Sequence, residues 1–210
     1  MKQDKAAARP GYHKGNVRER LVDAAEKILK EEELTALSLR RVAREVGVAP
    51  SAVYNHFENR DALLAAVAAD GHEQLVEMER AAYSGSGNAE DRIRTLALEY
   101  LRFAADNPSL YRLMFSPGIA ELRSHPDYSS AGEVSFRLAV ELYGEGSYDP
   151  RKTAISYPKA LSTWAILHGA AMQMLDGVIT VGTTKQNSIE ALSGAIIGVL
   201  LEGVREGIPK

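Results

Sequence analysis

The stretch from Ser38 to Phe57 constrains the fold of this chain more than any other segment. Its first half carries apolar residues at offsets 0, 3, 4 and 7 from Leu39, which lie on one face of a helix. Ser38 stands at the N-cap position, and Gly47 follows the last apolar residue, where a left-handed residue ends a helix. Pro50 stands just inside the start of a second helix, where its missing N–H costs little. The segment therefore predicts two short helices joined by a tight turn.

The second of these helices has an unusual outer face. Val53 and Phe57 lie four residues apart and are expected to point inward. A helix that buries two large side chains and exposes small and polar ones suits the major groove of DNA. The expected outer residues are Ser51, Ala52, Asn55 and His56.

The flanking segments complete a larger pattern. An apolar stripe runs from Val17 to Leu29 and is opened by Asn16, with Glu19 three residues later. Residues 16–64 together resemble the DNA-binding domain of the TetR family of transcriptional regulators. The segments that carry the resemblance are Arg18–Ile28, Ser38–Val46, Gly47-Val48, Tyr54-Asn55-His56-Phe57 and Arg60-Asp61-Ala62-Leu63.

This resemblance implies a set of DNA contacts. Tyr54 and His56 match positions that hold the DNA backbone, and Arg60 matches a phosphate contact. Arg40 can reach a guanine or a phosphate from the preceding helix. Two recognition helices would enter successive major grooves of a palindromic operator in double-stranded DNA. The full expected DNA-binding set is Ser38, Arg40, Arg41, Pro50, Ser51, Ala52, Tyr54, Asn55, His56 and Arg60.

The distribution of charge supports this orientation. The whole chain carries a net charge of −3, but residues 1–60 carry +3 and residues 61–210 carry −6. A basic end on an acidic body lets only one end approach phosphate. Residues 1–15 form an expected flexible basic arm that either contacts DNA or is a solvated tail. Its cations are Lys2, Lys5, Arg9 and Lys14.

The remainder of the chain predicts an all-α protein. A three-helix helix-turn-helix domain spans residues 16–62, and a helical-bundle domain for regulation and dimerisation spans 63–210. One helix is expected to begin near residue 131. Another runs from Pro150 to about Val178 with a bend near Pro158.

Composition and motifs exclude several classes of protein. The absence of cysteine excludes a disulfide framework and thiolate metal sites. No secretory signal is visible, and the longest strongly apolar stretch, residues 195–201, is too short to cross a bilayer. A cytoplasmic protein without membrane, metal or cofactor is therefore expected. The five histidines form no paired-ligand motif and no glycine pattern follows a strand, so an enzyme is not expected.

The last two long helices predict a dimer. Residues 188–204 are apolar almost all round, and such a helix must be covered on several faces. Ala165, Gly169, Ala195 and Gly198 are small residues that let another helix come close. By resemblance to the family, these helices pair with their copies in a homodimer; the alternative is a helix buried inside one monomer.

The segment Trp164–Gly169 resembles the WHG-type C-terminal domain of one branch of TetR-like regulators. Trp164 and His168 lie on one helix face, where they either line an effector cavity or pack in the core. Aromatic and methionine side chains give such a cavity an adaptable wall, which suits a small, largely apolar effector. The candidate lining is Tyr100, Phe103, Tyr111, Met114, Phe115, Trp164, His168 and Met172.

These features together predict a DNA-binding transcriptional regulator. By resemblance, it is a repressor that leaves a palindromic operator when a small-molecule effector binds. The alternative is a helical protein-interaction module without DNA binding, which gives no reason for the pattern from Tyr54 to Arg60.

Overall fold

The computed structural model describes residues 17–84, 88–115, 126–142, 146–179 and 185–206, and every regular element in these ranges is a helix. The expected all-α class is confirmed. The basic arm of residues 1–15 lies outside the described residues. The helices are α1 (Val17–Glu31), α2 (Leu39–Val46), α3 (Pro50–Val53), α4 (Arg60–Ser84), α5 (Ala89–Asp106), α6 (Pro108–Met114), α7 (Pro126–Leu142), α8 (Pro158–Leu175) and α9 (Lys185–Glu206), with short 3₁₀ turns η1 (Leu34–Ala36) and η3 (Ala154–Ser156).

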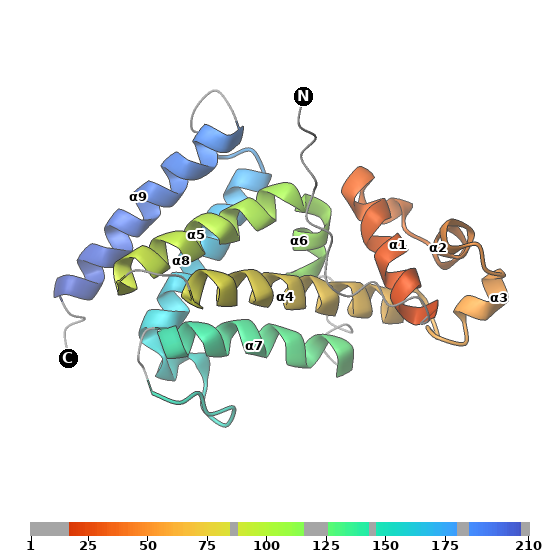
Figure 1. Ribbon diagram of the computed structural model, residues 1–210, viewed down its shortest axis with the longest axis horizontal. Coiled ribbons are helices and arrows are strands. Elements are labelled where there is room, and N and C mark those ends of the chain that lie inside the picture. The colour runs from red at the N-terminus through yellow and green to blue at the C-terminus, as the bar shows by residue number, and fades with distance from the viewer. Residues whose placement is uncertain (1–16, 85–87, 116–125, 143–145, 180–184, 207–210) are drawn as a thin grey trace, which may run out of the picture.

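Helix α4 connects the two parts of the molecule (Figure 1). Its first turns pack on α1, and its later turns pack between α5, α6 and α7. The stretch Ala62–Ala69 is almost completely buried, so this part of α4 is covered on all sides. The predicted domain boundary at residue 62 falls inside α4, and one continuous hydrophobic core joins the head formed by α1–α3 to the helical body.

Helix α6 approaches α4 closely at one position. A Cβ atom at Gly71 would lie 2.8 Å from the sulfur of Met114 and 3.0 Å from a methyl group of Leu110. A side chain larger than glycine at this position would therefore have to displace Met114 or Leu110.

Two helix boundaries differ from the sequence-based expectation. The predicted single helix from Pro150 to Val178 is wrong, because α8 begins at Pro158 after the separate turn η3. Tyr157, directly before this proline, has φ −128° and ψ 70°, as expected for a residue that proline keeps out of the helical region. Helix α7 begins at Pro126 rather than near residue 131.

Among the described residues, no helix is both long enough and apolar enough to cross a membrane.

Candidate DNA interface and regulatory cluster

Helix caps and one hydrogen bond to α1 stabilise the helix-turn-helix. The Ser38 hydroxyl accepts a hydrogen bond from the backbone N–H of Arg41, which caps α2 as expected. Gly47 ends α2 with φ 74°, a left-handed conformation that glycine adopts without cost. The Arg20 guanidinium donates to the Val46 carbonyl over 2.8 Å, which ties the end of α2 to α1.

The recognition element is a short helix followed by a turn. Helix α3 ends at Val53, four residues before the expected end, and residues 54–56 continue as a turn. The backbone N–H of Phe57 still donates to the Val53 carbonyl over 2.9 Å, so both side chains face the core. Val53 is completely buried and Phe57 is 2% exposed, while the guanidinium of Arg18 lies 5.1 Å from the Phe57 ring centre. The predicted inward face is therefore confirmed.

The outer face of this element carries most of the predicted DNA contacts. Tyr54 is 56% exposed, whereas Phe57, three residues later, is buried. Ala52 is half-buried. Pro50, Ser51, Asn55 and His56 are exposed on the same element, and the remaining exposed members of the predicted set are Ser38 and Arg40 at the start of α2.

Three other predicted contact residues already have partners within the protein. Ser38 is the cap described above. Arg41 forms a bidentate ion pair with Glu32, which holds the pKa of that carboxyl below its ordinary value. Arg60 donates from Nε to the Leu37 carbonyl over 2.9 Å and from a terminal nitrogen to the Leu34 carbonyl over 2.8 Å. A DNA contact by these residues stays a prediction, and each of them also shapes the head.

In the body, a group of aromatic side chains from α5, α6 and α8 meets at one place. The Tyr100 and Tyr111 hydroxyls lie 2.9 Å apart, and the Tyr111 hydroxyl lies 2.8 Å from Nδ1 of His168. Trp164 stacks on His168, with ring centres 5.4 Å apart and planes 5° apart. Phe115 lies 4.8 Å from Tyr111 and 4.6 Å from His168, centre to centre. We call Tyr100, Tyr111, Phe115, Trp164 and His168 the aromatic cluster.

The aromatic cluster runs from the core to the surface. Tyr100 and Tyr111 are buried, and burial raises the pKa of both phenols. His168 is half-buried, and the same loss of solvation lowers its imidazole pKa. Trp164 is 38% exposed and forms the outer end. The two hydroxyls and Nδ1 of the imidazole form one hydrogen-bonded chain.

The remaining predicted effector residues lie in the main core or in a cleft. Met114 is buried under α4 beside Gly71. Met172 is partly buried against the main core. Phe103 lines a cleft between α1, α4 and α5, together with residues outside the aromatic cluster. Effector binding by any member of the predicted set stays a prediction.

Two buried polar pairs between α4 and α7 were not predicted from the sequence. The Ser135 hydroxyl lies 3.0 and 2.9 Å from the two carboxyl oxygens of Glu79, and burial raises the pKa of this carboxyl to about 8. His72, two turns earlier on α4, packs edge-on against Tyr128 of α7, and burial lowers its pKa to about 4. The signal in the sequence is a polar residue at positions 72 and 79 of an otherwise apolar helical stripe.

The comparisons with known proteins agree with this architecture. Residues 21–67 match the bacterial regulatory proteins of the tetR family, and residues 93–196 match the tetracyclin repressor-like C-terminal domain. The chain belongs to the TetR family. The resemblance seen in residues 16–64 is thereby confirmed, and a TetR-family protein is a DNA-binding transcriptional regulator rather than an enzyme.

Solved structures show the same TetR fold along almost the whole chain. A protein of unknown function from Rhodococcus sp. RHA1 is 29% identical, with a TM-score of 0.71 over 91% of this chain and 97% of that one. A TetR transcriptional regulator from Rhodococcus sp. RHA1 is 20% identical, with a TM-score of 0.62 and coverage of 89% and 97%. The transcriptional regulator FadR from Bacillus subtilis, in complex with stearoyl-CoA, is 14% identical, with a TM-score of 0.66 and coverage of 88% and 98%.

In this TetR-family protein the small residues predicted for the dimer interface, on α8 and α9, are at least partly exposed to solvent. Ala165, Ala195 and Gly198 are exposed, and Gly169 is partly exposed. A Cβ atom added at Gly169 or Gly198 would meet nothing within 4 Å. Within the described part of the protomer these glycines are therefore not needed for packing. Val199, beside Gly198, is 66% exposed.

Proposed function

We propose that the protein is a homodimeric repressor that leaves a palindromic operator when a small, largely apolar effector binds. The observation that carries this proposal is the outer face of α3 and its following turn, where Tyr54, Asn55 and His56 are exposed above buried Val53 and Phe57. A face of this kind suits the major groove. As a regulator of transcription, the protein would act on DNA in the cytoplasm.

An electrophoretic mobility shift with the DNA upstream of the protein's own gene tests this proposal. Arg40→Ala and Tyr54→Ala should each weaken binding about tenfold, because each removes an exposed side chain that would face the DNA in the proposed complex. Arg94→Ala is the matched control, since Arg94 is exposed on α5 and pairs there with Glu90. Unchanged binding by both head variants would contradict the docking mode and favour the interaction module without DNA binding.

The proposed dimer uses the open faces of α8 and α9. Among the described residues, a Cβ atom added at Gly169 or Gly198 would meet nothing within 4 Å, and exposed apolar side chains such as Ile166 lie on the same helices. A second copy would bury this surface and bring two heads to one DNA site. Sedimentation velocity should show a dimer at micromolar concentration, and a monomer would contradict the proposal.

The proposed effector site is the aromatic cluster. Its side chains are aromatic with a few hydrogen-bonding groups, which is typical of sites for small apolar ligands. The Bacillus subtilis FadR, which shares the fold, binds stearoyl-CoA; this supports a ligand site within the fold and says nothing of the effector here. Tyr111 lies on α6, and α6 also contacts the head, where the Ser109 hydroxyl donates to the Glu32 carbonyl over 3.3 Å. A ligand that moves α6 would therefore change the head.

A thermal-shift screen tests the effector site. A ligand that binds the folded protein should raise the melting temperature of the wild type and release the operator in the mobility shift. Trp164→Ala should reduce this rise, whereas Arg94→Ala should leave it unchanged. If every ligand found in the screen binds Trp164→Ala as tightly as the wild type, the effector site is not the aromatic cluster.

A further inference from the structure

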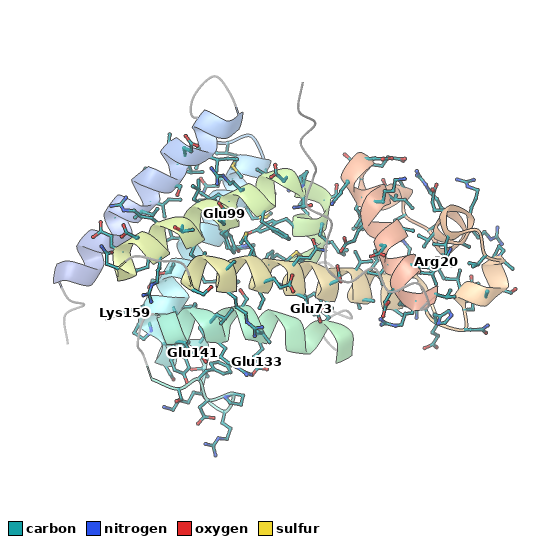
Figure 2. All side chains as sticks on the ribbon, in the orientation of Figure 1. Arg20, Glu73, Glu99, Glu133, Glu141 and Lys159 are labelled. Carbon is teal, nitrogen blue, oxygen red and sulfur yellow. The ribbon has the colours of Figure 1, made fainter. Side chains whose placement is uncertain are left out.

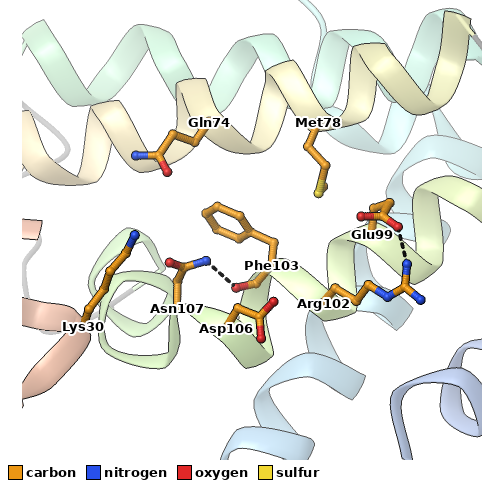
Figure 3. A pocket seen from close by; sticks show the side chains of 8 residues that line it. All are labelled: Lys30, Gln74, Met78, Glu99, Arg102, Phe103, Asp106 and Asn107. Carbon is orange, nitrogen blue, oxygen red and sulfur yellow. Dashed lines mark hydrogen bonds and ion pairs between the residues drawn. The ribbon is translucent and has the colours of Figure 1, made fainter. Parts of the chain in front are cut away.

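A cleft lies between α1, α4 and α5, and none of its lining residues belongs to the aromatic cluster (Figure 3). Its volume is about 480 Å³, within the range of pockets that hold small ligands. Its walls come from both parts of the molecule, since α1 belongs to the head while α4 and α5 belong to the body (Figure 2). The lining residues are Lys30, Gln74, Met78, Glu99, Arg102, Phe103, Asp106 and Asn107.

The first polar group of the cleft is the side-chain amide of Gln74. Its nitrogen donates to a Glu26 carboxyl oxygen over 2.8 Å and to an Asp70 carboxyl oxygen over 2.7 Å. An ionised carboxylate only accepts hydrogen bonds, so both N–H groups must face these two residues. The amide oxygen of Gln74 is consequently turned to the opposite side, where Figure 3 shows it pointing into the cleft.

A second amide is oriented by the same logic. The side-chain nitrogen of Asn107 donates to the Phe103 carbonyl over 3.0 Å, and a carbonyl can only accept. The amide oxygen of Asn107 therefore faces away from α5, toward the side where Lys30 lies (Figure 3). Lys30 is exposed and brings an ammonium group from α1. This end of the cleft offers one cationic donor and two neutral acceptors.

The rest of the cleft is lined by apolar side chains, by ion-paired ones and by the carboxylate of Asp106. Phe103 is 9% exposed and forms the floor with the thioether of Met78 (Figure 3). At the far end the Arg102 guanidinium forms ion pairs with Glu99 over 2.6 Å and with Glu190 over 3.6 Å, so its positive charge is already matched by carboxylates of the protein. Asp106 adds a negative charge to the α5 side, which restricts an anionic group of a ligand to the end formed by Lys30.

We propose that this cleft is a second ligand site, for a small planar aromatic acid that carries an N–H or O–H donor. The carboxylate would pair with Lys30, the ring would lie on Phe103 and Met78, and the donor would bond to the amide oxygen of Gln74 or Asn107. A ligand held in this way joins α1 to α4 and α5. The site therefore goes beyond the effector function of the aromatic cluster, because it acts on the junction between head and body directly.

Isothermal titration calorimetry with indole-3-carboxylate tests the proposal on the full chain. This probe carries the acid, the flat ring and one N–H. 1-Methylindole-3-carboxylate lacks the donor and indole lacks the acid, so each should bind about fivefold more weakly or worse. Equal affinity for all three compounds, or no detectable heat with the first, would overturn the assigned chemistry.

Matched variants locate the binding. Lys30→Gln should weaken the binding of indole-3-carboxylate about fivefold. Lys27→Gln should not, because Lys27 is exposed on the same helix but outside the cleft. Trp164→Ala should leave the affinity unchanged, since it alters only the aromatic cluster. An unchanged affinity in Lys30→Gln, or a loss in Trp164→Ala, would overturn the site. The heat is measured without DNA, so a failure of operator binding does not affect this result.

Discussion

Replacing Glu79 by glutamine should change how the stability of the protein depends on pH. Both oxygens of this buried carboxyl face one hydroxyl, that of Ser135, which has a single proton to donate. On the α5 side the buried phenol of Tyr100 is near enough to interact with its charge. Loss of solvation raises the pKa of Glu79 from an ordinary 4.5 to about 8. The folded protein therefore keeps a proton that the unfolded chain releases.

The sign and size of the effect follow from this difference. A group that binds protons more tightly in the folded state contributes stability that is fully present below pH 4.5 and is lost as the pH rises to about 8. The two pKa values correspond to roughly 5 kcal/mol in all, of which roughly 3 kcal/mol falls between pH 5 and 8. Any opening of the α4–α7 contact to water would reduce this figure.

Ionisation of His72 should make the stability of the protein rise with pH, the opposite of the Glu79 effect, and at lower pH. Burial lowers its pKa from an ordinary 6.5 to about 4, so the unfolded chain binds a proton that the folded protein refuses. Its contribution is present above pH 6.5 and is lost as the pH falls to 4, by up to roughly 3 kcal/mol. The groups around it are the Met114 carbonyl, Phe115 and Tyr128, none of them charged. The wild type should therefore be most stable near pH 6.

Urea unfolding followed by circular dichroism, at several pH values and fixed protein concentration, measures both slopes. Glu79→Gln keeps a hydrogen-bonding side chain but cannot ionise, so it should be about 3 kcal/mol more stable than the wild type at pH 8 and within about 1 kcal/mol at pH 5. Glu77→Gln, at an exposed position of the same helix, should follow the wild type. The reasoning is refuted if Glu79→Gln loses stability with rising pH as steeply as the wild type.

Three further changes test other parts of the structure. A Cβ atom at Gly198 would meet nothing within 4 Å among the described residues, so Gly198→Leu should leave the fold intact yet shift sedimentation toward monomer; a variant that remains dimeric would contradict the proposed interface. Gly71→Ala should cost about 1–3 kcal/mol in urea unfolding because its methyl group collides with Met114, and a neutral result would show that α6 shifts freely. Tyr111→Phe removes the hydroxyl between Tyr100 and His168 and should cost about 1–3 kcal/mol in the same assay; no loss of stability would show that water replaces the hydroxyl.

The head could be predicted from the sequence because its determinants are local. The cap at Ser38, the left-handed Gly47 and the inward pair Val53 and Phe57 all act within one or two helical turns. The partners of its arginines could not be predicted in the same way. The Arg60 guanidinium bonds to backbone carbonyls 23 and 26 residues away, and no side-chain pattern marks a carbonyl as an acceptor.

The body shows a second limit. Tyr100 and Phe103 lie on the same apolar stripe of α5, but one reaches the aromatic cluster and the other lines the cleft beside Met78. The helical period predicts which residues share a face of one helix. Which of those residues come into contact with one another depends on how the neighbouring helices pack. Glu79 is a stronger case, because its partner Ser135 lies 56 residues away on a helix whose packing the sequence does not fix.

The stacked pair at the outer end of the aromatic cluster has a spectroscopic consequence. Trp164 is the single tryptophan of the 210-residue chain, so all indole fluorescence comes from this position. Its ring lies parallel to the His168 imidazole, and an imidazolium in such contact accepts an electron from excited indole and quenches it. Emission should therefore fall as the pH drops below 6.5, with a midpoint below that value because burial lowers the His168 pKa. The helical body thus contains its own fluorescent probe, and a molecule that separates the two rings would be seen as a gain in emission without any attached dye.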